Sequence, residues 1–204
     1  MSGDVADVSV GTRAAAGLDL LSTRRSPLLL RPPGPDGATL RAILQMAMCG
    51  PDHGRLAPWR FIVIEGDARE AFGRVLCDSL RRRVPDADDA MLAREAAKAL
   101  RAPTIVVVAA QVRAGVAIPA IEQQIAAGIA AYNLLLAAHA FGLAGMWRTG
   151  ATAYDAGVRR ALGLDDDAFI VAFLYLGTPD ATPRPRAPVS FEAHVRCWSP
   201  PGGR

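Results

Sequence analysis

The feature that most constrains the fold of this 204-residue chain is residues 125–147, a stretch without any formally charged side chain. Its length would suffice to cross a bilayer. However, the stretch is rich in alanine and contains Asn133, His139 and three glycines, and alanine and glycine drive membrane insertion only weakly. A helix that is apolar on all sides is also typical of a protein core. We therefore predict a core helix over 119–141, ended by Gly142 and packed against a partner subunit.

The remaining patterns predict helices and strands mixed along the chain. Apolar residues at helical spacing, such as Leu40, Ile43 and Leu44, predict a helix, and the continuous β-branched run at 104–110 predicts a buried strand. This order predicts an α+β fold with a sheet of at least three strands. The predicted helices are 14–23, 39–48, 67–83 (capped by Asp67), 89–100, 119–141 and 155–162; the predicted strands are 61–65, 104–110 and 169–176, with 147–149 extended.

The length of the chain suits one domain, and no repeat or internal linker divides it. We predict a single domain at 14–199, a flexible extension at 1–13 and a tail at 200–204. The proline-rich segment 178–188 is expected to wrap another surface. Because the first thirteen residues lack the apolar core of an export signal, we expect a cytoplasmic protein.

Composition excludes several kinds of partner. Apolar residues make up 51% of the chain and charged residues 21%, which predicts a packed core. The net charge is +3, but the arginines are dispersed, and the one cluster, Arg81–Arg83, is interpreted as a solvated helix face rather than a nucleic-acid site. The cysteines (Cys49, Cys77 and Cys197) are odd in number and far apart, so we predict neither disulfides nor a zinc site.

Common catalytic motifs are absent from the sequence. It contains no G-x-S-x-G elbow, no Walker A motif and no H-x-H or H-E-x-x-H pair. Its glycines also do not form G-x-G-x-x-G after a strand, so an ordinary dinucleotide fold is not predicted. A redox cofactor, if one binds, is held by another scaffold.

Two polar clusters are candidates for a ligand site. Arg24-Arg25-Ser26 ends a predicted helix and offers two guanidinium groups and a hydroxyl group, which suit a phosphate ester. The same arginines would also complement a helix dipole. The loop from Pro51 to Phe61 could hold His53 and Trp59 over a planar ligand. Alternatively, Trp59 belongs to the core and His53 to the surface.

A third cluster, Trp147-Arg148-Thr149-Gly150, directly follows the uncharged helix. Arg148 is surrounded in sequence by apolar residues, which predicts that it is buried. A buried guanidinium group needs a partner, because an unpaired buried charge costs several kcal/mol. That partner is either a distant carboxylate or a bound anion such as a phosphate.

In their order and spacing these clusters resemble the nitroreductase family, in particular its small single-domain branch of NAD(P)H nitroreductases. The resemblance covers about residues 16–179. The segments that carry it are Leu20–Ser26, Pro51–His53, Pro58–Phe61, Glu65-Gly66, Arg101–Pro103, Glu122-Gln123, Ala127-Gly128, Gly145–Gly150 and Phe173–Pro179.

The resemblance implies a nitroreductase-like fold, with a central mixed or antiparallel sheet flanked by helices and the long apolar helix at a dimer interface. It also implies FMN as cofactor, NAD(P)H as electron donor and a flavin site shared between two subunits. In that family the segments matching Arg24, Arg25, Ser26, Trp147, Arg148 and Thr149 contact FMN from one subunit, and the segment matching His53 contacts it from the other. Cys49 stands where relatives often have a basic residue that touches the flavin, and 137–142 matches a stretch assigned to nicotinamide contacts.

The function implied is reduction of a small nitroaromatic, quinone or similar acceptor by ping-pong hydride transfer. No side chain is assigned a catalytic role, since the flavin itself would carry the chemistry. Two alternatives stay open: a non-catalytic FMN-binding storage or sensor protein, and a thiol enzyme that uses Cys49. The expected partners are a second copy of the chain and a small acceptor, with neither nucleic acid nor membrane.

Overall fold

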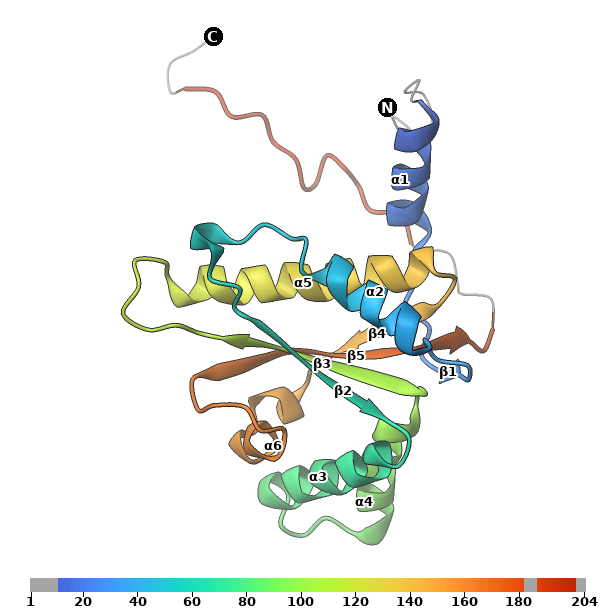
Figure 1. Ribbon diagram of the computed structural model, residues 1–204. Coiled ribbons are helices and arrows are strands. Elements are labelled where there is room, and N and C mark those ends of the chain that lie inside the picture. Colours follow the sequence, from blue (N-terminus) through green and yellow to red (C-terminus); the bar gives the residue numbers. More distant parts are fainter. Residues whose placement is uncertain (1–10, 182–186, 201–204) are drawn as a thin grey trace.

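The computed structural model describes residues 11–181 and 187–200, which form an α+β fold (Figure 1). Within these residues five strands make one sheet in the order β1-β5-β3-β2, and β4 pairs with the remaining edge of β5. All strand pairs in this part of the chain are antiparallel, which confirms the predicted fold class. The strands are β1 (Leu30–Arg31), β2 (Trp59–Glu65), β3 (Thr104–Gln111), β4 (Ala144–Arg148) and β5 (Ala168–Pro179).

Helices cover both faces of the sheet (Figure 1). On one face lie α2 (Gly37–Ala47) and α5 (Ala120–Ala140), with α1 (Thr12–Thr23) projecting beyond them. On the other face lie α3 (Ala68–Arg83), α4 (Asp89–Ala96) and α6 (Ala156–Ala161). Short 3-10 turns occur at His53–Arg55, Ala97–Leu100 and Ala151–Tyr154.

The central strand β3 is buried from Thr104 to Ala110, as its β-branched sequence predicts. Because side chains alternate along a strand, Ile105 and Val107 join the core beneath α3 and α6. Val106 and Val108 join the second core, beneath α2 and α5. One strand therefore supplies the centre of both cores.

Helix α5 confirms the prediction made from the uncharged stretch, and no helix among the described residues is long and apolar enough to cross a membrane. Its packing against a partner subunit stays a prediction. One side of α5 packs on the sheet, whereas Ile121 and Ile125 are 59% and 53% exposed on the other. Both faces of the helix are therefore apolar, and the described residues cover only the face that packs on the sheet.

Several boundaries differ from the predictions. Helix α1 begins at Thr12, so the end of the predicted extension 1–13 is helical, and residues 1–10 lie outside the described residues. The predicted helix 89–100 divides into α4 and a 3-10 turn, which is a common way for a helix to tighten at its end. β4 begins at Ala144, three residues before the predicted extended segment, and β1 was not predicted.

The predicted wrapping segment 178–188 lies only partly within the described residues. Thr178 and Pro179 end β5, whereas 182–186 lie outside the described residues, as do 201–204 of the predicted tail. Residues 187–200 are exposed along their whole length and run past α1, away from the sheet (Figure 1). Of the described part of the predicted segment, Thr178 and Pro179 pair with β1, whereas residues 187 and 188 are exposed.

An ion pair joins α6 to α3. Asp155 caps α6 by accepting hydrogen bonds from the backbone amides of Gly157 and Val158, and it also receives two from Arg82. Burial alone would raise the pKa of the Asp155 carboxyl group, but the bonds from Arg82 and the backbone outweigh it and lower the pKa to about 2. A lowered pKa stabilises the fold above the unfolded value of 3.8, and this contribution is lost as the pH falls toward 2.

We therefore expect Asp155→Asn to lower the free energy of unfolding at pH 7 by about 1–3 kcal/mol, with a smaller loss between pH 4 and pH 2 than in the wild type. Urea unfolding measured across this pH range checks the prediction. Asp166→Asn is the matched control, because Asp166 pairs with Arg159 at 3.2 Å but is 86% exposed. Equal pH profiles for wild type and Asp155→Asn would contradict the role of the pair.

The packing of β4 on α5 depends on Gly145. A Cβ atom at this position would overlap the side chain of Leu135 on α5 and lie 3.1 Å from a methyl carbon of Leu176 on β5. We expect Gly145→Val to lower the free energy of unfolding by about 1–3 kcal/mol, as overpacking does. Gly128→Ala within α5 is the control, because its Cβ would meet only Val171, at 3.9 Å. Thermal unfolding compares the two, and a Gly145→Val variant as stable as the control would refute this packing.

Candidate functional site

Strand β4 has one edge paired with β5, and no described strand pairs with the other. A cavity lies at each of its ends. The carboxyl-end cavity, of about 400 Å³, is lined by Phe72, Leu76, Arg83, Glu95, Lys98, Arg101, Trp147, Arg148, Thr149, Gly150, Ala151, Thr152, Phe173 and Tyr175. The amino-end cavity, of about 470 Å³, is lined by Thr23, Arg25, His139, Gly142, Leu143, Ala144 and Pro179.

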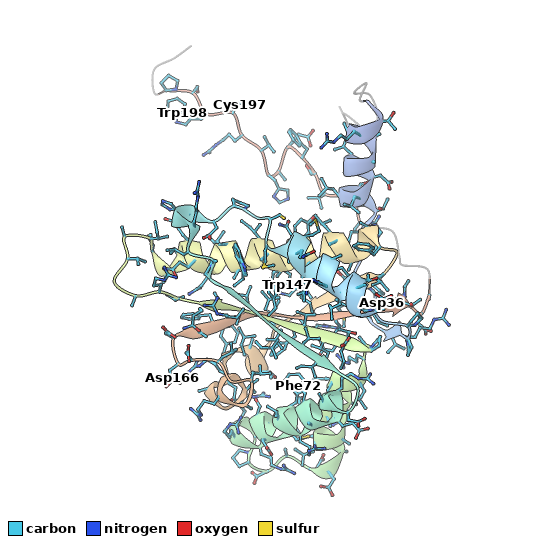
Figure 2. All side chains as sticks on the ribbon, in the orientation of Figure 1. Asp36, Phe72, Trp147, Asp166, Cys197 and Trp198 are labelled. Atoms are coloured by element: carbon cyan, nitrogen blue, oxygen red, sulfur yellow. The ribbon has the colours of Figure 1, made fainter. Side chains whose placement is uncertain are left out.

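Successive side chains of β4 point to opposite faces of the sheet. Trp147 packs beside the core beneath α2 and α5 and borders the carboxyl-end cavity (Figure 2). Arg148 lies opposite Phe173 of β5, whose ring contacts Phe72 on the α3 side of the sheet. The two neighbouring residues therefore approach the cavity from different layers of the fold.

Arg148 is exposed, so the prediction that it is buried is wrong. Its Nε donates to Sδ of Met146 at 3.2 Å, and the rest of the guanidinium group faces a cavity open to solvent. The prediction failed because Arg148 is the last residue of β4 and lies at the margin of the core. Its apolar neighbours in sequence pack above and below the sheet and do not cover it. Arg148 needs no buried carboxylate.

Positive charge is concentrated in the carboxyl-end cavity. Arg83, Lys98, Arg101 and Arg148 all line it, and Glu95 is the one acidic residue in the lining. Lys98 pairs with Oε2 of Glu95 at 2.6 Å, which leaves an excess of positive charge. The cavity therefore suits an anionic or electron-rich ligand.

Tyr175 lies in the wall of the same cavity and is 5% exposed. Burial raises the pKa of its phenol group above the usual value, and the positive charges of Arg101 and Arg148 oppose the rise only in part. The phenol group therefore stays protonated at neutral pH and is available as a hydrogen-bond donor.

The Arg24–Ser26 segment follows α1 and borders the amino-end cavity through Arg25. Arg24 donates to Oγ of Ser26 at 3.0 Å, and Nη1 of Arg25 donates to the carbonyl oxygens of Ser22 and Arg24. Four residue steps separate Ala144 from Arg148, which is about 13 Å along a strand. Arg25 and Arg148 line different cavities, so they would contact different parts of an elongated ligand.

The structure leaves His53 and Cys49 outside both cavities. His53 is exposed, and its Nδ1 lies 2.6 Å from Oε2 of Glu122 in the first turn of α5. Cys49 is also exposed, and its thiol donates to the carbonyl oxygen of Gln45. Since His53 bonds to Glu122, the structure contains no Cys49–His53 pair that could activate the thiol. Trp59, at the start of β2, is half-buried.

The sequence did not single out five charged or phenolic residues of the carboxyl-end cavity, namely Arg83, Glu95, Lys98, Arg101 and Tyr175. Arg83 belongs to a run that was interpreted as a solvated helix face; it is exposed, as that interpretation requires, and it also lines the carboxyl-end cavity. Lys98 is the only lysine of the chain, but its neighbours in the sequence form no motif that would indicate a site. Glu95, Arg101 and Tyr175 carried no pattern of their own. His139, in the amino-end cavity, lies in the stretch 137–142, which the resemblance matched only to nicotinamide contacts.

Comparison with known proteins gives consistent matches. The family model described as "Nitroreductase family" matches residues 21–178. The protein named "Putative NAD(P)H nitroreductase YdjA" from Escherichia coli K12 is 40% identical over 162 residues, which cover 79% of this chain and 87% of that protein. A relative from Haemophilus influenzae, named "Putative NAD(P)H nitroreductase", is 33% identical with the same coverage.

Solved structures support the same assignment at the level of the fold. A nitroreductase-like family protein from Bacillus cereus superposes with a TM-score of 0.77 at 20% identity, covering 95% of this chain and 99% of that one. The FMN-dependent nitroreductase NfnB from Mycobacterium smegmatis, solved with NADPH, gives a TM-score of 0.70 at 19% identity, covering 92% of this chain and 100% of that one. The chain belongs to the nitroreductase family.

Proposed function

We propose that this chain is an FMN-dependent NAD(P)H oxidoreductase that reduces small acceptors, such as nitroaromatic compounds or quinones, by a ping-pong hydride transfer. Family membership supports an oxidoreductase in the broad sense, and the NfnB structure supports the choice of FMN and a nicotinamide donor. The observation that carries the proposal is the pair of cationic cavities at the two ends of the free edge of β4.

The residues present fit such a cofactor. FMN is elongated, with a phosphate group at one end and a planar ring at the other. Arg24, Arg25 and Ser26 supply guanidinium and hydroxyl donors for the phosphate at the amino end of β4. The backbone and side chains of 147–149 would contact the ring end of the flavin at the carboxyl end of β4, about 13 Å along the strand.

When bound, the flavin supplies the redox chemistry, because it can take a hydride from a nicotinamide and give it to an acceptor. The chain's own residues bind and orient. Lys98, Arg101 and Arg148 place positive charge at the ring end, where it would favour a ligand that gains negative charge during the reaction. Tyr175 offers a protonated phenol group beneath them. No side chain needs to act as a dedicated acid or base.

We further propose a homodimer with a shared flavin site in the cytoplasm. The exposed apolar residues of α1, α2 and α5, among them Leu21, Met46 and Ile125, are more than an isolated domain would leave in water. A partner packed on this surface would cover the free side of α5. His53 and Cys49, which lie outside the cavities of their own chain, would then belong to the partner's site. Exposed thiols at Cys49 and Cys197 fit a reducing compartment.

The first test is the cofactor itself. The purified protein is expected to carry a yellow chromophore that is released by heat and identified as FMN by chromatography. Under anaerobic conditions, NADH or NADPH should reduce the flavin and bleach its colour, and a quinone or nitroaromatic acceptor should restore the colour. A bound flavin that neither nucleotide reduces would favour the storage or sensor alternative, and a colourless monomer that gains no thermal protection from added FMN would refute the proposal.

The second test is Arg148→Ala, which removes a charged donor from the carboxyl-end cavity. We expect at least about tenfold weaker FMN binding, the usual result of losing a charge-assisted hydrogen bond, and a weaker dimer. Flavin fluorescence titration and size-exclusion chromatography measure the two effects. Arg74→Ala is the control, because Arg74 is exposed on α3 and lines neither cavity. Unchanged FMN affinity in Arg148→Ala would remove Arg148 from the site.

A third test concerns Cys49. If the flavin carries the reaction, Cys49→Ser should keep nearly full turnover, since the thiol has no base beside it. Steady-state oxidation of NADPH with a quinone measures the rate. A loss of activity greater than about tenfold, with FMN still bound, would instead support the thiol enzyme.

A further inference from the structure

We infer that His139 is a binding residue for the phosphate group of the flavin, held in place by Thr23. The inference rests on the proposed function and adds a residue at the amino-end cavity. His139 lies in the last turn of α5 and lines this cavity together with Thr23 and Arg25. Three segments far apart in sequence therefore meet at one cavity: the end of α1, the end of α5 and the start of β4.

Hydrogen bonding shows which ring nitrogen of His139 is used within the chain and which faces a ligand. The hydroxyl group of Thr23 has one hydrogen, which it donates to the carbonyl oxygen of Asp19 at 2.7 Å. Oγ1 of Thr23 also lies 2.8 Å from Nε2 of His139. Because the hydroxyl hydrogen is already used, the oxygen accepts and Nε2 carries a hydrogen. Nδ1 is then the nitrogen left for a ligand, since it has no partner within the part of the chain that the structure describes.

The charge of the cavity also suits a phosphate. Arg25 uses only Nη1 in bonds to carbonyl oxygens, so Nε and Nη2 keep their donors among the described residues. None of the lining residues is acidic. The nearest carboxylate in sequence to Pro179 is Asp180, which pairs with Arg31 at 3.7 Å. Arg25 and a protonated His139 would together supply donors to two sides of one anion.

The bond between Thr23 and His139 has a second consequence. Helix α1 has no buried residue, so burial does little to hold it on the domain. The Thr23–His139 bond is the one side-chain hydrogen bond that the described residues of α1 make to another helix. It therefore positions the Arg24–Ser26 segment that directly follows. A phosphate bound between Arg25 and His139 would strengthen this connection.

A comparison of FMN with riboflavin tests the inference, because the two differ only by the phosphate group. We expect His139→Ala to weaken FMN binding at least about tenfold and to leave riboflavin binding unchanged. His139→Gln keeps an N–H donor for Thr23 but cannot carry a charge, so it should keep the melting temperature of the wild type while still losing FMN affinity. Thr23→Val should weaken FMN binding less than His139→Ala, because the imidazole group remains.

Fluorescence titrations of both flavins, with melting temperatures measured without flavin, give all the readouts. Arg74→Ala serves as the control for the loss of a surface cation. Equal weakening of FMN and riboflavin binding in His139→Ala would overturn the inference, because it would indicate a general effect on the site. A phosphate also occurs in NAD(P)H, so unchanged FMN affinity with a raised KM for the nucleotide would overturn the assignment to the flavin. Failure of the wild type to bind FMN would refute the proposed function itself.

Discussion

The partial pairing of β5 determines where this protein can bind a ligand. β5 is bonded along one edge to β3 and along part of the other to β4, and no described strand extends the sheet beyond β4. The backbone of β4 therefore lies at a margin, with a cavity at each end. Gly145 allows α5 to approach this margin closely, because any side chain there would meet Leu135. The site depends on this contact as much as on the residues that line it.

Charge then distinguishes the two ends of the margin. The carboxyl end collects four cationic side chains from α3, the segment after α4, and β4, whereas the amino end has Arg25 and His139. Neither cavity has an excess of acidic groups. Such an arrangement favours a ligand that is anionic at one end and electron-rich at the other. A second feature is the apolar side of α5, where Ile121 and Ile125 remain exposed among the described residues.

Part of the fold was predictable because local patterns carry it. The continuous β-branched sequence of β3 predicted a buried strand, and the uncharged stretch predicted α5. β1 was not predictable, because two residues between prolines form a strand only by pairing with the far end of β5. The sequence also could not tell which side of α5 faces the sheet, because an all-apolar helix gives no periodicity that separates a core face from an interface.

For the candidate site, the sequence by itself determined the order of the motifs, and hence the family, and it predicted Arg24–Ser26 and Trp147–Thr149 as ligand contacts. Only the tertiary structure decided which residues share a cavity. Arg83, Lys98 and Arg148 meet there although up to 65 positions separate them (148 − 83). Arg148 is exposed rather than buried for the same reason. The surroundings of a side chain depend on the pleat of its strand and on the packing of distant helices, and neither can be predicted from its neighbours along the chain.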